Sequence, residues 1–281
     1  AGDAAPQLPR AELAAVFRVM ADLLGDPAWP QLHPRPCTDT PWPGLQCEAA
    51  PDDARVLRAT RLHFGPDVAT PPCRPGARLG AASLRGLPHL KTLSLFGCFA
   101  GAGVELPAAL FAGAAPSSLE QIVLKSNPGL RGPMPATLGR LRSLRVLSLS
   151  QNAFGGGIPR ELAGLAALQQ LDLSYNNITG EVNQTCETKR NFVTCRAIKR
   201  CYARRDRITI PHQQIPEEIG GMASLTILDL SWNGIAGGVP AAMGRLRRLQ
   251  KADLSYNRLA GRVPPEVGSL RELMFLDLSH N

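Results

Sequence analysis

The sequence predicts an α/β solenoid of about eight stacked coils, with a helical cap at its amino-terminal end. Three observations predict this fold. A leucine pattern recurs through most of the chain with a usual spacing of 24 residues, a segment with helical apolar spacing precedes it, and two cysteines follow that segment. The 281 residues are 44% hydrophobic and 19% charged, a composition that can bury a substantial core.

The repeated unit has the form LxxLxLxxN, as in "LRVLSLSQN", "LQQLDLSYN" and "LTILDLSWN", with a weaker first unit in "LRATRLHFG". Its alternating leucines point inward from one short parallel strand, and its Asn can bond backbone groups in the following turn. No unit buries its own leucines, so the units must stack, which predicts a leucine-rich-repeat solenoid with its strands on the concave face. The closing residues are Cys98, Asn127, Asn152, Asn176, Asn233, Asn257 and Asn281.

Residues 1–56 are predicted to form the cap region. The stretch "AELAAVFRVMADLLGDPAW" has helical apolar spacing, and "PCTDTPWPGLQC" follows it. The 24-residue period with "LxGxIPxxLGxL" resembles the plant extracellular subclass of leucine-rich repeats. The front end resembles the amino-terminal cap of plant cell-surface repeat proteins, in which a helix covers the first coil and two cysteines close a loop. This resemblance implies that Cys37 and Cys47 form a disulfide.

A narrower resemblance concerns residues 10–181 and 215–281. The stretches "LKTLSLFGCFA" and "LEQIVLKSNPGLRGPMPATLGRL" resemble the Piriformospora indica-insensitive group of plant receptor-like proteins. The resemblance implies an extracellular recognition scaffold, the ectodomain of a receptor-like protein that binds a protein or peptide and acts with a receptor kinase in signalling or defence. The alternative is a secreted inhibitor of a cell-wall-degrading enzyme, similar to the polygalacturonase inhibitors, which carry more coils and a disulfide-bonded end cap.

A second cysteine pair is predicted from the repeat itself. Cys98 occupies the closing Asn position of its unit, and Cys73 lies on the return path of the preceding coil, so the two can meet. The alternative for Cys98 is a buried free cysteine that fills the Asn position.

Residues 182–214 interrupt the repeats of 57–181 and 215–281. Asn176 and Asn233 lie 57 residues apart, and removing the 33 residues from Val182 to Gln214 restores both the 24-residue spacing and a "GEIP" turn. A valine codon begins with GT and a glutamine codon can be CAG, so the favoured interpretation is a translated intron. The alternative is an island domain that folds onto the concave face.

The composition of this insertion allows two further interpretations, both weaker. It carries eight Lys or Arg against two acidic residues, which is +6 of the net charge of +8, and three of the seven cysteines. A zinc site is disfavoured because Cys186, Cys195, Cys201 and His212 include no closely spaced cysteine pair. A nucleic-acid site is disfavoured because the arginines are scattered and match no known module.

Partner-binding residues are predicted on the exposed side of the strands and beside them. Exposed apolar residues there favour contact with a protein or peptide. The recurring Asp172, Asp229, Asp253 and Asp277, each with Ser two residues on, are interpreted as a repeat feature that bonds neighbouring coils. Asn177 and Asn183 begin glycosylation sequons. The predicted partner-binding residues are Phe96, Gln121, Lys125, Gln170, Tyr175, Ile227, Trp232, Lys251, Tyr256 and Phe275.

The sequence contains no recognisable catalytic, metal-binding or phosphate-binding motif, so we expect no enzyme activity, metal or cofactor. No apolar run is long enough to span a membrane. No leader of charged and then apolar residues precedes Ala1, so we expect any targeting peptide to have been removed from an extracellular protein. The chain stops at Asn281 without an end cap, and we expect a fragment or shortened product with exposed leucines in its last coil.

Overall fold

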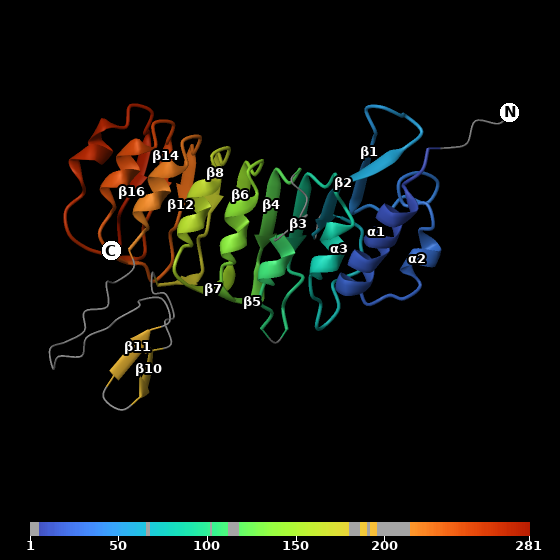
Figure 1. Ribbon diagram of the computed structural model, residues 1–281, viewed down its shortest axis with the longest axis horizontal. Helices are drawn as coiled ribbons and strands as arrows, with labels where there is room; N and C mark the ends of the chain where they lie inside the picture. The colour runs from blue at the N-terminus through green and yellow to red at the C-terminus, as the bar shows by residue number, and fades with distance from the viewer. Residues whose placement is uncertain are drawn as a thin grey trace.

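A computed structural model shows a row of stacked coils joined by one nine-stranded sheet (Figure 1), which confirms the predicted solenoid. It describes residues 6–65, 68–101, 103–111, 118–179, 186–189, 192–195 and 214–281. Eight strands of the sheet are parallel and in register, one from each coil: β2 (Leu57–Phe64), β3 (Thr92–Phe96), β4 (Gln121–Lys125), β6 (Val146–Ser148), β8 (Gln170–Asp172), β12 (Ile227–Asp229), β14 (Lys251–Asp253) and β16 (Phe275–Asp277).

The convex side is built from short helical turns. A proline with extended backbone precedes most of the 3₁₀ helices, because "GxIP" ends the extended segment and fixes φ for the turn that follows. These elements are α3 (Ala81–Arg85), η1 (Ala108–Phe111), η2 (Ala136–Arg140), η3 (Arg160–Gly164), η4 (Glu217–Gly221), η5 (Ala241–Arg245) and η6 (Pro265–Ser269). Small side sheets join β5 (Asn127–Pro133), β7 (Asn152–Gly156) and β9 (Asn177–Ile178), and β13 (Ala236–Gly237) and β15 (Arg258–Leu259).

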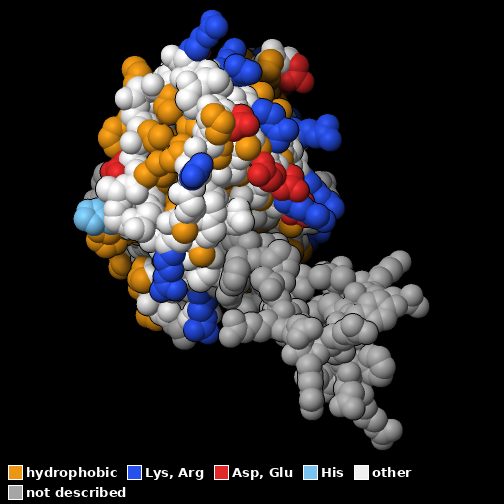
Figure 2. All heavy atoms as spheres, turned by 90° about the vertical axis from the view of Figure 1, so that its left-hand side faces the viewer, with side chains coloured by type: hydrophobic (Ala, Val, Ile, Leu, Met, Phe, Trp, Pro, Cys, Tyr) orange, Lys and Arg blue, Asp and Glu red, His pale blue; other side chains and the backbone are white. Residues whose placement is uncertain are grey.

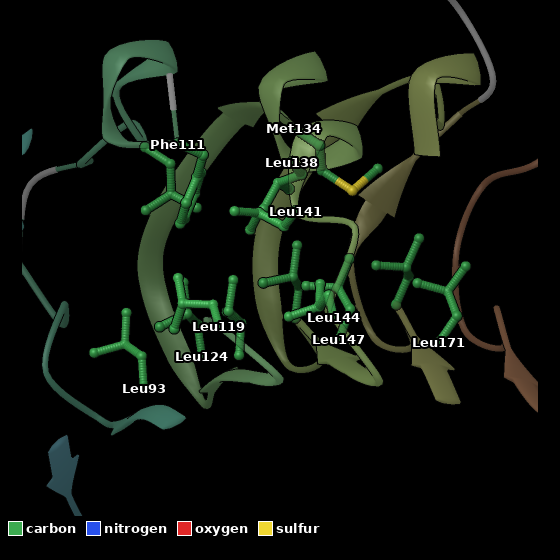
Figure 3. Close-up of a cluster of buried hydrophobic side chains, with 14 of the residues drawn as sticks. Leu93, Phe111, Leu119, Leu124, Met134, Leu138, Leu141, Leu144, Leu147 and Leu171 are labelled. Carbon is green, nitrogen blue, oxygen red and sulfur yellow. The ribbon is translucent and has the colours of Figure 1, made fainter. Parts of the chain in front are cut away.

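The core is the stack of inward-pointing leucines between these two sides (Figure 3). Leu93, Leu124, Leu147 and Leu171 come from successive strands, and all four are fully buried. Each leucine packs against the coil before and the coil after it, so a coil is stable only within the stack.

The closing Asn residues connect consecutive coils. The side chain of Asn176 donates to the carbonyl of Leu149 in the preceding coil at 2.8 Å and to that of Leu173 in its own coil at 3.0 Å. Its Oδ1 accepts the amide of Phe154 at 3.0 Å. The predicted role in the turn is therefore correct, and the structure adds that each Asn satisfies buried backbone groups of two coils at once.

The cap covers the first coil with α1 (Arg10–Leu23) and the short α2 (Trp29–Leu32). Glu12 of α1 is 3% exposed, accepts a bond from Arg58 Nη1 at 2.6 Å and accepts the amide of Ala59 at 3.2 Å. These contacts fix the helix on β2. The edge strand β1 (Leu45–Ala49) pairs antiparallel with β2, which the sequence did not predict.

Both predicted disulfides are present. Cys37 and Cys47 join within the cap, with Cα atoms 5.8 Å apart, and Cys73 and Cys98 join with Cα atoms 4.9 Å apart. Cys73 also forms a β-bridge with Leu24, next to the end of α1. The second disulfide therefore links the cap to the second coil, because Cys98 occupies the closing Asn position of that coil.

The sheet continues without a shift across the insertion. Gln170 of β8 pairs directly with Ile227 of β12, and Asn233 bridges to the carbonyl of Leu173 at 2.9 Å as the other closing residues do. Within the insertion, β10 (Cys186–Lys189) and β11 (Phe192–Cys195) form a separate antiparallel hairpin. The intron and island interpretations both stay open, and Cys201, His212 and Asn183 lie outside the described residues.

Deleting residues 182–214, which joins Glu181 to Ile215, is expected to raise the melting temperature. Closing the longer connection costs about 0.8 kcal/mol, and a change of this size shifts the melting temperature by about 2–4 °C. Differential scanning fluorimetry of the two purified chains measures the shift. The full chain with Cys186, Cys195 and Cys201 changed to Ser separates loop length from cysteine mispairing. A lower melting temperature of the deletion variant would show that the insertion stabilises the fold.

The end of the solenoid at β16 exposes apolar side chains (Figure 2). Met274 is 81% exposed and Leu276 is 38% exposed, whereas Leu228 at the corresponding position of β12 is fully buried. The expectation of exposed leucines in the last coil is confirmed for Leu276, whereas Leu273 and Leu278 are partly buried. Among the described residues, no helix has the length and apolar character needed to cross a membrane.

Candidate functional site

The predicted partner-binding residues occupy three parallel lines along the sheet and its rim. The first line, here called the central row, follows one register position from coil to coil, so its side chains all point to the concave face. Gln121 and Lys251 are exposed, and Phe275 is 44% exposed. The central row comprises Thr92, Gln121, Val146, Gln170, Ile227, Lys251 and Phe275.

Lys251 and Phe275 are in contact within the central row. The ammonium of Lys251 lies 5.1 Å from the centre of the Phe275 ring, within the range of a cation–π interaction. The second line is shorter. Phe96 pairs with Lys125 four residues further along β3 and β4, and the centre of the Phe96 ring lies 5.6 Å from that of the His63 ring.

The third line is a stack of exposed rings at the rim, here called the aromatic ladder: Tyr175, Trp232, Tyr256 and His280. Successive ring centres lie 5.2, 3.9 and 4.1 Å apart, with interplanar angles of 9°, 12° and 18°. Tyr175, Trp232 and Tyr256 remain 49%, 44% and 38% exposed. Stacking holds the rings in place before any partner arrives, so little side-chain entropy is lost on binding.

The backbone explains why the rings line up. Each ladder residue directly precedes a closing Asn and has a left-handed conformation, with φ between 52° and 56°. This conformation costs energy in residues with a side chain, and it is retained because the buried Asn network of every coil requires the same turn. The coil that ends in Cys98 has Gly97 at this position, with φ 64°.

The prediction that the recurring Asp and Ser residues bond neighbouring coils is correct only in part. Ser174 donates its amide and its hydroxyl to Asp172 at 3.1 and 2.7 Å, and the same pair of bonds recurs at Asp229 and Asp253. These bonds lie within one coil, because the serine is only two residues away. A bond between coils joins Ser148 to Asp172 at 2.9 Å.

The Asp row gives the concave face an acidic floor in its carboxyl-terminal half. Burial raises the pKa of Asp229, the Ser231 bonds lower it, and the neighbouring Asp172 and Asp253 raise it further. At the exposed end of the row, bonds from Ser279 lower the pKa of Asp277. Repulsion along this row disfavours an anionic ligand over these coils.

The remaining candidate sites are a glycosylation site, a metal site and two residues of the first coil. Asn177 is exposed on β9, where a glycan has room, and its glycosylation stays a prediction. In the part of the chain that the structure describes, no three His, Cys, Asp or Glu side chains come together as metal ligands. The prediction missed Arg61 and His63 in the first coil, although Arg61 pairs with Thr92 and so extends the central row. The weak repeat "LRATRLHFG" gave the only signal for them.

Comparisons with known proteins agree with this geometry. Models described as leucine-rich repeats match residues 117–178, 221–238 and 248–270. Receptor like protein 29 of Arabidopsis thaliana is 35% identical over 148 residues, which cover 52% of this chain and 30% of that protein. Piriformospora indica-insensitive protein 2 of the same plant is 32% identical over 150 residues, covering 52% and 34%. The similarity is thus shared among receptor-like proteins and does not single out the predicted subgroup.

Each of these matches spans about a third of the relative's length. Among solved structures, the ectodomain of the Arabidopsis membrane receptor kinase GASSHO1/SCHENGEN3, in complex with CASPARIAN STRIP INTEGRITY FACTOR 2, has a TM-score of 0.66. It is 23% identical, and the match covers 94% of this chain and 29% of that one, so it shows the fold alone. The chain is therefore a leucine-rich-repeat solenoid that is similar to plant receptor-like proteins.

Proposed function

We propose that this chain is an extracellular recognition scaffold, the ectodomain of a receptor-like protein that binds a protein or peptide and acts with a receptor kinase. The observation that carries the proposal is the aromatic ladder beside the central row. Tyr and Trp are enriched among the residues that dominate binding energy, and here three of them stand exposed in a fixed stack. The two disulfides fit an oxidising compartment.

The preferred ligand is an extended segment that lies across several strands. The central row offers amide, apolar and cationic side chains at successive coils, spaced about 4.8 Å apart. Ring edges of the aromatic ladder add apolar area along one side of the same coils. A ligand that crosses β8, β12 and β14 would contact both lines at once, which favours a linear peptide or an exposed protein loop.

Exchanging Trp232 for Asn is expected to weaken peptide binding about tenfold or more, because it removes a central ring of the ladder. Asn tolerates the left-handed backbone, so the turn is kept. Peptides selected by the full chain from a displayed random dodecamer library provide the probes, and isothermal titration calorimetry measures their affinity. Lys251→Glu tests the central row in the same assay.

Arg142→Ala serves as the control, because Arg142 is exposed and follows η2, away from the strands. Selected peptides that bind both variants as well as the unchanged chain would refute binding at this face. Addition of the chain to a fungal polygalacturonase assay tests the inhibitor alternative, and loss of enzyme activity there would favour it.

A further inference from the structure

A polar pocket of about 110 Å³ lies at the amino-terminal end of the concave face, between β1 and β2. Gln46 of β1 stands directly opposite Arg61 of β2, so both side chains reach the same face. This volume holds several atoms, since a single water needs only about 10–15 Å³ by the same measure. Its lining residues are Pro43, Gly44, Gln46, Arg61, His63 and Val68.

The pocket wall depends on a close approach of two backbones. Gly44 accepts the amide of His63 at 2.7 Å, and a Cβ on Gly44 would lie 2.4 Å from the carbonyl oxygen of His63. A larger residue would therefore push the loop away from β2 and open the pocket.

Arg61 differs from the other cations around it. Arg58 on the same strand bonds Glu12 at 2.6 Å, and Lys91 bonds Glu48 at 2.6 Å. Within the described residues no ion pair includes Arg61, whereas Arg58 is paired through Nη1. The buried Nε of Arg61, like that of Arg58, has no hydrogen-bond partner. An unpaired, partly buried guanidinium is costly unless a ligand supplies acceptor oxygens, and a carboxylate can accept two of its N–H groups at once.

The pocket is aligned with the proposed peptide site. Arg61 is in register with Thr92 and Gln121, so it is the first member of the line that the central row continues. From β2 to β16 this line is about 34 Å long at 4.8 Å per strand, the length of about ten residues of extended peptide. The acidic floor at Asp172 to Asp277 repels an anion from the other end, which favours a ligand orientation with its carboxylate at the first coil.

We propose that this pocket binds a carboxylate of the peptide ligand through Arg61, and thereby anchors one end of the peptide at the first coil. The proposal deepens the proposed function and rests on it for the nature of the ligand. The carboxylate comes either from the carboxyl terminus of the peptide or from an Asp or Glu side chain, and the two sources present the same pair of oxygens to the guanidinium.

The test follows the Nε–Hε signal of Arg61 by NMR in the full chain labelled with ¹⁵N-arginine. The probes are acetyl-Gly-Gly-Gly with a free carboxyl terminus, its carboxyl-terminal amide, and acetyl-Gly-Asp-Gly amide. We expect the Arg61 signal to shift with a carboxylate probe and not with the triglycine amide. The probe that binds more tightly identifies the source of the carboxylate.

Arg61→Gln is expected to weaken carboxylate binding at least tenfold without lowering the melting temperature, because Nε bonds nothing in the fold. Arg61→Lys keeps the charge but not the paired donors, so it should retain only part of the affinity. Arg142→Gln is the matched control. Equal binding of the carboxylate and the amide, or unchanged binding by Arg61→Gln, would overturn the proposal.

The design also separates this proposal from the proposed function. Trp232→Asn leaves the pocket intact and should not change the response of Arg61 to the small probes. If the chain binds the small carboxylates but selects no peptide from the library, the carboxylate pocket is supported and the proposed peptide-binding function is refuted. If the chain selects peptides but does not bind the small carboxylates, the peptide-binding function is supported and the pocket is not part of its site.

Discussion

Replacing both Cys73 and Cys98 by Ala is expected to lower the free energy of unfolding by about 3–4 kcal/mol. The disulfide spans 25 residues, and a cross-link of that span removes more conformations from the unfolded chain than a short one does. Cys98 is also 4% exposed, so its truncation leaves space in the core. Urea unfolding followed by circular dichroism measures the change.

Two further variants test whether loop length explains this loss of stability. Replacing Cys37 and Cys47, which are only 10 residues apart, should cost less, about 2–3 kcal/mol. Cys73→Ala combined with Cys98→Asn restores the closing residue of the repeat and should recover about 1–2 kcal/mol of the loss. If the long cross-link proved no more stabilising than the short one, the loop-length explanation would fail.

Asn127→Ala is expected to lower the free energy of unfolding by about 3–5 kcal/mol, because it leaves several buried backbone groups without hydrogen-bond partners. Asn127 is fully buried and accepts the amides of Cys98 and Phe99 at 2.7 and 3.1 Å. Its Nδ2 donates to the carbonyls of Leu95 and Lys125 at 3.0 and 2.9 Å. Alanine replaces none of these bonds, and water cannot reach the vacated site without opening the coil.

Hydrogen exchange locates this effect. In Asn127→Ala the amides of Cys98 and Phe99 should exchange far faster than in the unchanged chain, whereas amides near β14 should change little. Arg142→Ala, an exposed substitution in the same coil, should alter stability by less than about 0.5 kcal/mol. A loss below 1 kcal/mol for Asn127→Ala would mean that the closing Asn is only a turn residue.

The repeat fold could be predicted because the buried leucines recur at the same positions of each sequence repeat. Leu147 and Leu171 recur at one position of one pattern, and only stacking removes both from water. The prediction of Ser and Asp bonds between coils was only partly correct, because these contacts depend on turn geometry. Ser174 bonds its own Asp172 because the backbone brings positions two residues apart together, and the spacing of repeats contains no information on that choice.

The candidate site could be predicted in part for the same reason. Trp232 and Tyr256 were expected to lie beside the strands, but their stacking follows from a left-handed backbone that the sequence does not reveal. Arg61 was missed because the first unit departs from the repeat pattern. Its pocket also needs β1, an antiparallel strand that belongs to the cap and has no periodic signal.

The unbroken register across the insertion has a consequence for the speed of folding. Most neighbouring strands join after closing a loop of about one coil, whereas β8 and β12 must find each other across the 57 residues between Asn176 and Asn233. The additional closure entropy, about 0.8 kcal/mol, slows that one step about fourfold relative to a 24-residue closure. For folding that propagates from the cap, the pairing of β12 with β8 is therefore expected to be slower than the pairing of β14 with β12.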